Sequence, residues 1–92
     1  MKQLSVTVIN EVGLHARPAS VFVRECARFK SKIRVHNATT DNKWVDGKSI
    51  LGVLTLGIEK GHQVGMEIEG PDEEEAATVL AGLIENDFKD KL

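Results

Sequence analysis

The chain has 92 residues, of which 41% are hydrophobic and 28% charged, and its formal net charge at pH 7 is −2. These values predict one small globular domain over residues 1–92, and the weak negative charge argues against binding of nucleic acid through bulk charge. The single cysteine, Cys26, excludes an internal disulfide. Neither a membrane span nor a secretion signal is visible, so a cytoplasmic location and no membrane partner are predicted.

The first half of the chain alternates between strand and helix patterns. Hydrophobic residues at every second position predict a strand at about residues 3–9. Gly13 ends the following turn, and a helix is predicted from Pro18, because proline is tolerated in a first turn. Its apolar stripe consists of Ala19, Phe22, Val23, Cys26 and Phe29. Ile33 and Val35 then indicate a second strand.

The second half repeats this alternation. Lys43 to Val45 predicts a short third strand closed by Asp46-Gly47, and Ser49 is the expected N-cap of a short helix that stops near Gly57. A fourth strand is predicted around residues 64–68. Pro71-Asp72 and three glutamates then begin a last helix, with a buried face of Ala76, Val79, Leu80, Leu83 and Ile84. Four short strands with one apolar face each favour an α+β fold, with helices on a single side of the sheet.

The stretch Gly13-Leu14-His15-Ala16-Arg17-Pro18-Ala19 carries the clearest chemistry. A helix N-terminus attracts anions, because its first N–H groups lack helical partners. A neutral imidazole is a good nucleophile at cellular pH, and a guanidinium offers two parallel donors to a phosphoryl group. His15 and Arg17 at this position therefore predict a phosphohistidine site, with Ala16 and Pro18 completing the loop around the phosphoryl group.

The same stretch resembles the active-site signature of the HPr family, the histidine-containing phosphocarriers of the bacterial sugar phosphotransferase system. The stretch from Lys48 to Gly57, KSILGVLTLG, resembles the second signature of that family, which surrounds a regulatory serine. The order of elements also matches, and the similarity spans nearly all of the chain. Two departures stand out: the segment between the motifs is a few residues longer than usual and contains Trp44, and Glu11-Val12 replaces small or hydroxyl residues.

The resemblance implies a function and a fold. His15 would accept a phosphoryl group on Nδ1 from phosphorylated enzyme I and donate it to a IIA domain, while Arg17 holds that group and no cofactor takes part. The fold would be an open-faced sandwich, in which three helices cover one face of a four-stranded antiparallel sheet. Glu11 would add negative charge near the phosphoryl group. Gly13 is expected to leave the ring free to reorient.

Ser49 and its surroundings suggest regulation and docking. The resemblance implies phosphorylation of Ser49 by an HPr kinase/phosphorylase, with a transcriptional regulator as a further partner, whereas a capping role alone is the simpler interpretation. One or two of Ile50, Leu51 and Leu54 are expected in the core and the rest in an exposed apolar patch. Val53 and Leu56 are assigned to packing. The predicted docking face consists of Leu14, Ser20, Arg24, Lys48, Ile50, Leu51 and Leu54, on a chain expected to be a monomer.

The remaining reactive side chains have simpler interpretations. His36 and His62 show no metal-ligand spacing with His15, so no metal site is predicted. Cys26 falls on the apolar stripe of the first helix, where a thiol packs as a small hydrophobe. Phe22 and Phe29 are core candidates, and Trp44 is expected to be partly exposed near the second hairpin.

Three functions remain open from the sequence. The first is the phosphocarrier, a relay protein rather than a stand-alone enzyme. The second is an allosteric interaction protein whose signal is carried by Ser49. The third is a phosphohistidine enzyme such as a mutase or phosphatase, which the absence of an arginine directly before His15 disfavours. The sequence does not distinguish a sugar-transport branch from a nitrogen-related or a dihydroxyacetone kinase branch.

Overall fold

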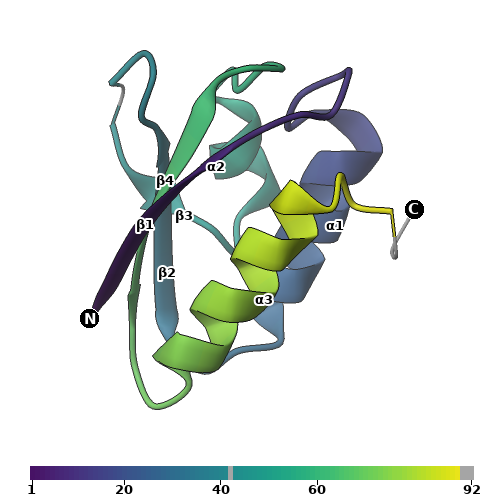
Figure 1. Cartoon of the computed structure of the whole chain (residues 1–92). Helices are drawn as coiled ribbons and strands as arrows, with labels where there is room; N and C mark the ends of the chain where they lie inside the picture. The colour runs from purple at the N-terminus through teal and green to yellow at the C-terminus, as the bar shows by residue number, and fades with distance from the viewer. Residues whose placement is uncertain (42, 90–92) are drawn as a thin grey trace.

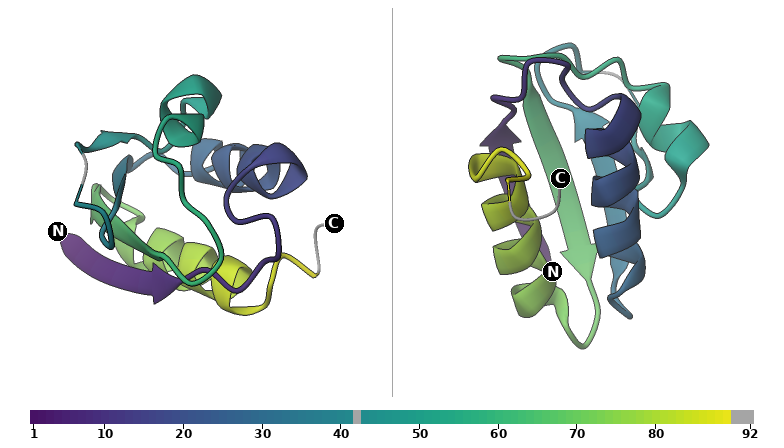
Figure 2. Two further views of the ribbon diagram at one scale, coloured as in Figure 1. Left: turned by 90° about the horizontal axis from the view of Figure 1, so that it is seen from above. Right: turned by 90° about the vertical axis from the view of Figure 1, so that its right-hand side faces the viewer.

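The computed structural model describes residues 1–41 and 43–89. In these residues the chain forms a four-stranded sheet, ordered β1-β4-β2-β3, and three helices. The elements are β1 (Lys2–Thr7), α1 (Ala16–Ala27), β2 (Lys32–Asn37), β3 (Val45–Asp46), α2 (Ile50–Leu54), β4 (Gln63–Glu69) and α3 (Glu73–Glu85) (Figure 1). Every strand pair is antiparallel, and the helices lie on one side of the sheet (Figure 2). The predicted open-faced α+β fold is confirmed.

The core lies between the sheet and the helices. Alternate residues of the three long strands point inward, because side chains alternate between the two faces of a strand, and α1 and α3 cover them with one apolar stripe each. The fully or almost fully buried side chains include Val35, Val64, Met66 and Ile68 from the sheet and Phe22, Cys26, Leu80 and Ile84 from the helices. Phe22 and Phe29 are both buried, as predicted.

The opposite face of the sheet carries polar and charged side chains. Arg34 of β2 donates to Glu67 of β4 at 3.2 Å. The ring of Trp44 stacks on His36 with centroids 3.8 Å apart, and the Arg34 guanidinium lies 5.5 Å from the Trp44 ring centroid. Gly65 permits this arrangement, because a Cβ there would meet the His36 ring at 2.5 Å. Trp44 is half-buried, so the expected partial exposure is confirmed.

Element boundaries differ from the sequence prediction where the chain turns. β1 ends at Thr7, because the chain leaves the sheet and Ile9 is 48% exposed. α1 begins at Ala16, so Pro18 is its third residue and still within the first turn. β3 covers only Val45–Asp46, which is later and shorter than predicted.

Asp72 ties the start of α3 to the turn between α1 and β2. Its carboxylate accepts the backbone N–H groups of Lys30 and Ser31, each at 2.9 Å, and also the Ser31 hydroxyl. These donors, the hydroxyl above all, lower the pKa of Asp72 to about 2, because they stabilise the ionised carboxylate. Asp72 is the N-cap residue of α3 but makes no side-chain capping bond to that helix.

The turn after α3 returns an aromatic ring to the core. Asp87 and Phe88 both adopt positive φ, 55° and 59°, a region that residues other than glycine rarely occupy. The Phe88 side chain is 1% exposed. Phe88 is a core residue that hydrophobic periodicity did not predict. Among the described residues, no helix combines the length and the apolar character needed to cross a bilayer.

Candidate functional site

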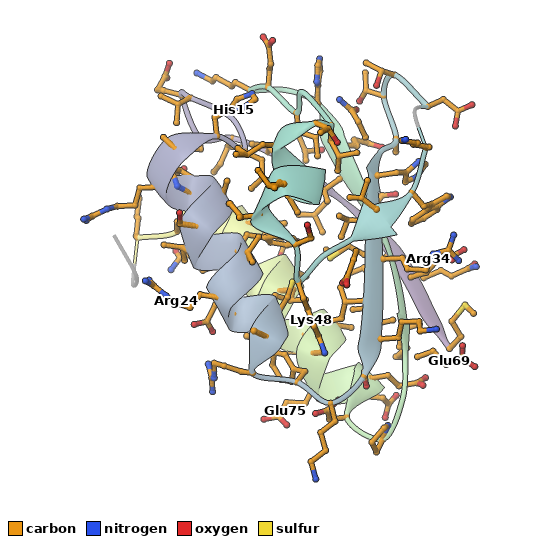
Figure 3. All side chains as sticks on the ribbon, turned by 180° about the vertical axis from the view of Figure 1, so that it is seen from behind. His15, Arg24, Arg34, Lys48, Glu69 and Glu75 are labelled. Atoms are coloured by element: carbon orange, nitrogen blue, oxygen red, sulfur yellow. The ribbon has the colours of Figure 1, made fainter. Side chains whose placement is uncertain are left out.

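His15 lies at the N-terminal end of α1 (Figure 3). It is the N-cap residue, with extended backbone (φ −129°, ψ 169°), and its side chain makes no capping hydrogen bond. The imidazole is half-exposed rather than packed in the core. The ring is therefore open to a partner at the point where the positive end of the helix dipole meets solvent.

Backbone donors surround this position. Within residues 1–41 and 43–89, the N–H groups of Ala16 and Arg17 have no hydrogen-bond partner, because they belong to the first turn. The first intrahelical bond runs from the Ala19 N–H to the His15 carbonyl at 3.4 Å. Ala16 adopts φ 52°, a conformation that costs a residue with a Cβ roughly 1–2 kcal/mol. Pro18 is buried and has no N–H, so it fixes the backbone and donates nothing.

Arg17 adds positive charge beside these amides. It is exposed and lines a shallow hollow together with Ser20, Val21 and Arg24. The spacing of these residues places them on one face of α1. The hollow thus presents the Arg17 guanidinium in the first turn of α1, the Ser20 hydroxyl, and the Arg24 guanidinium in the last turn. This basic strip along the helix suits an anionic ligand or an acidic protein surface.

The loop before His15 rests on the segment between α2 and β4. The Leu14 N–H donates to the Ile58 carbonyl at 2.9 Å, and the Leu14 side chain is 0% exposed. The prediction of Leu14 as a docking residue is wrong, because its side chain belongs to the core. Gly13 has φ 70°, and a Cβ there would lie 2.3 Å from the Ile58 carbonyl oxygen. The close approach and the positive φ both require glycine at this position.

A polar cluster around the buried Asn37 holds that supporting segment in turn. The His62 Nδ1 atom accepts the Glu59 N–H at 3.1 Å and lies 3.0 Å from the Asn37 side-chain nitrogen. Asn37 is completely buried and also donates to the Leu56 carbonyl at 3.4 Å. Asn37 and Ile58 are supporting residues that sequence reasoning missed, since neither belongs to a motif.

Glu11 has a cationic partner. Its carboxylate accepts a hydrogen bond from the Lys60 ammonium at 2.7 Å. This bond and the charge of Lys60 lower the pKa of Glu11, and the reverse effect raises the pKa of Lys60. The expected negative charge in the loop is therefore balanced by a positive charge from the neighbouring loop.

Ser49 caps α2, as predicted. Its Oγ accepts the Gly52 N–H at 3.1 Å. Ile50, Leu51 and Leu54 are 37%, 76% and 38% exposed, so the expectation that one or two of them enter the core is wrong. Val53 and Leu56 fill the core instead, as predicted. Because a five-residue helix has a narrow buried side, the other three form an exposed apolar patch.

The remaining docking candidates differ in exposure. Ser20 and Arg24 are exposed on α1, and Figure 3 shows Arg24 farther along the helix than His15. Lys48 is half-buried, and its ammonium donates to the Phe29 carbonyl at 2.7 Å. Its charge is thus turned toward the end of α1.

The other potentially reactive groups are embedded in structure. Cys26 is completely buried, and burial raises the pKa of its thiol to about 12, so it packs as predicted. In the part of the chain that the structure describes, no three histidine, cysteine, aspartate or glutamate side chains gather as metal ligands.

Comparison with known proteins gives one consistent result. Residues 2–86 match the PTS-HPr family, described as PTS HPr component phosphorylation site. The chain is 41% identical over 88 residues to the phosphocarrier protein HPr of Pseudomonas aeruginosa, with 96% of each chain covered. HPr-C-His from Thermoanaerobacter tengcongensis superimposes with a TM-score of 0.91 at 44% identity over the full length of both chains. Bacillus subtilis Crh, described as a dimer with a swapping domain, gives a TM-score of 0.71 at 38% identity, covering 95% of this chain and 97% of that chain.

Proposed function

Since this chain belongs to the HPr family and is a phosphocarrier of the phosphotransferase system, we propose that His15 is the residue that carries the phosphoryl group. Enzyme I is the proposed donor and a IIA component the proposed acceptor, because members of this family operate between these two partners. The observation that carries the assignment is the half-exposed imidazole at the N-cap of α1, next to the unpartnered amides of Ala16 and Arg17.

The transfer needs little more than placement and charge. In the first step, Nδ1 of His15 forms a bond to phosphorus as the bond between phosphorus and the donor breaks. The Ala16 and Arg17 N–H groups and the Arg17 guanidinium stabilise the phosphoryl oxygens. In the second step, a nucleophile of the IIA component attacks phosphorus in line, and the P–N bond breaks. The open position of the site lets both partners approach, which a closed pocket would prevent.

Labelling with enzyme I and phosphoenolpyruvate tests this assignment. We expect one acid-labile, base-stable phosphoryl group on the wild-type chain and none on the His15→Ala variant. His36→Ala is the matched control, because His36 is also half-buried but stacks on Trp44 in the sheet. Labelling that persists in the His15→Ala variant would refute the proposal.

The proposed docking face combines the exposed patch of α2 with the basic hollow of α1. Its members are Ser20, Arg24, Ile50, Leu51 and Leu54, with Lys48 at the margin. An apolar centre with a basic rim fits a partner that presents an acidic, partly apolar surface. Reversal of Arg24 to glutamate should raise the KM for phosphorylated enzyme I. An unchanged KM would remove Arg24 from the face.

A second proposal concerns regulation through Ser49. The cap places its Oγ at the start of α2, beside the exposed Ile50 and Leu51. A phosphate there would add roughly −1.5 to −2 charge to the docking face and repel an acidic partner. Incubation with HPr kinase/phosphorylase and ATP should label the wild-type chain and spare Ser49→Ala, and the product should bind a transcriptional regulator. Label on Ser49→Ala would contradict this proposal, whereas label on Ser49 without transfer through His15 would favour the purely allosteric protein.

A further inference from the structure

The turn after α3 contains a strained aspartate whose side chain points back to the His15 loop. Asp87 and Phe88 are consecutive residues with positive φ, and such strain persists only where other contacts compensate for it. Burial accounts for Phe88. Asp87 is only half-buried, and its Oδ1 accepts a hydrogen bond from Asn10 Nδ2 at 2.9 Å, across 77 positions of sequence.

Asn10 connects this turn to the loop before His15. Its side-chain Oδ1 accepts the Val12 N–H at 3.1 Å, and its backbone carbonyl accepts the Gly13 N–H at 3.0 Å. One end of the amide is thus bound to the C-terminal turn and the other end to the segment that leads directly into His15. Without an acceptor at Asp87, the Asn10 amide would lose its donor contact and could rotate away from Val12.

We propose that Asp87, acting through Asn10, is a positioning residue for phosphoryl transfer at His15. The inference rests on the proposed function. Asp87 does not contact the phosphoryl group in this arrangement; it fixes the orientation of the loop through the Asn10 amide. In-line transfer is sensitive to displacements of about 1 Å, so a looser loop lowers the rate of the chemical step while the docking face stays unchanged.

An exchange of donor and acceptor tests the contact. Asn10→Asp retains the acceptor for the Val12 N–H but removes the donor and places two carboxylates against each other. Asp87→Asn leaves an acceptor in place. The double variant Asn10→Asp/Asp87→Asn restores one donor and one acceptor in exchanged positions, with the same net charge as the wild type. Asp41→Asn is the matched control, because Asp41 also has positive φ but lies in the turn after β2.

The readouts are kcat and KM for phosphorylation by enzyme I, the free energy of unfolding, and the NMR shifts of the His15 ring. Asn10→Asp should lower kcat by about fivefold with little change in KM, and the double variant should return to within about twofold of wild type. Asp87→Asn and Asp41→Asn should stay near wild type. Asp87→Gly, in which glycine tolerates positive φ, removes the acceptor instead of the donor. It serves as the second variant that breaks the contact should Asn10→Asp fail to fold, and it should lower kcat similarly.

Three results separate the possible failures. If the wild-type chain accepts no phosphoryl group on His15, the proposed function itself fails. If the wild type is phosphorylated and folded Asn10→Asp or Asp87→Gly is equally fast, only the positioning role is lost. A double variant as slow as Asn10→Asp, with an unfolding free energy restored to that of wild type, would show that the contact is structural alone.

Discussion

Truncation of one buried and one exposed leucine distinguishes a core residue from a residue of the docking face. Leu14 lies next to His15 and is 0% exposed, whereas Leu51 on α2 is 76% exposed. Both changes to alanine remove the same atoms. We therefore expect Leu14→Ala to act on the free energy of unfolding and Leu51→Ala to act on the affinity for enzyme I.

The magnitudes follow from burial. Removal of a fully buried leucine side chain costs about 2–5 kcal/mol, because it loses apolar burial and leaves a cavity. That is a large part of the roughly 5–15 kcal/mol by which a small domain is stable. Leu51→Ala should change the unfolding free energy by less than about 0.5 kcal/mol, as exposed positions usually do. It should weaken enzyme I binding by about fivefold, the range of a moderate interface contact.

Urea unfolding followed by circular dichroism measures the first quantity, and calorimetric titration with enzyme I measures the second. The folded fraction of Leu14→Ala should bind enzyme I with nearly the wild-type affinity. Equal destabilisation by both changes would refute the assignment of Leu51 to the surface. A Leu14→Ala variant of wild-type stability with weakened binding would restore Leu14 to the docking face.

Three further outcomes can be checked on the isolated protein. The pKa of Asp72 is about 2 in the folded chain and about 3.9 in the unfolded chain, so its stabilising effect is complete above about pH 4 and is lost as the pH falls toward 2. Urea midpoints should fall less over this range for Asp72→Asn than for wild type, and an equal fall in both would contradict the role of Asp72. Gly65→Ala should displace the ring of His36, cost about 1–3 kcal/mol and alter the fluorescence of Trp44, whose unchanged emission would contradict the stacking described here. The thiol of Cys26, with a pKa of about 12, should react with a disulfide reagent at least about 100-fold faster in urea than in the folded protein, and rapid labelling of the folded chain would contradict its burial.

Periodicity predicted the elements well because most of them bury a regular stripe or every second residue. It failed where a single tertiary contact decides the environment. Leu14 stands in a loop, so nothing in the local pattern distinguishes an exposed side chain from one anchored by the Ile58 carbonyl. Phe88 follows the last helical turn, and its side chain reaches the core because Asp87 and Phe88 itself adopt positive φ. No pattern in the sequence predicts this backbone conformation.

The residues of the candidate site also divide into those that the sequence predicts and those that only tertiary contacts reveal. His15, Arg17 and Ser49 could be found from the sequence, because their chemistry depends on residue type and on position at a helix start. Asn10, Asn37 and Asp87 could not, since each acts through a partner that is distant in sequence. The docking face, the location in the cell and the monomeric state stay predictions.

The order of strands also bears on how the chain is made. β4 pairs with both β1 and β2, so β1 finds its neighbour only after the segment from α1 to α2 has been synthesised. Pairing over such separations is slow, because the long intervening segment loses conformational entropy on loop closure before the strands gain any contact. During synthesis β1 therefore remains unpaired until β4 emerges, and this is the stage at which a chaperone would protect the most exposed strand edge.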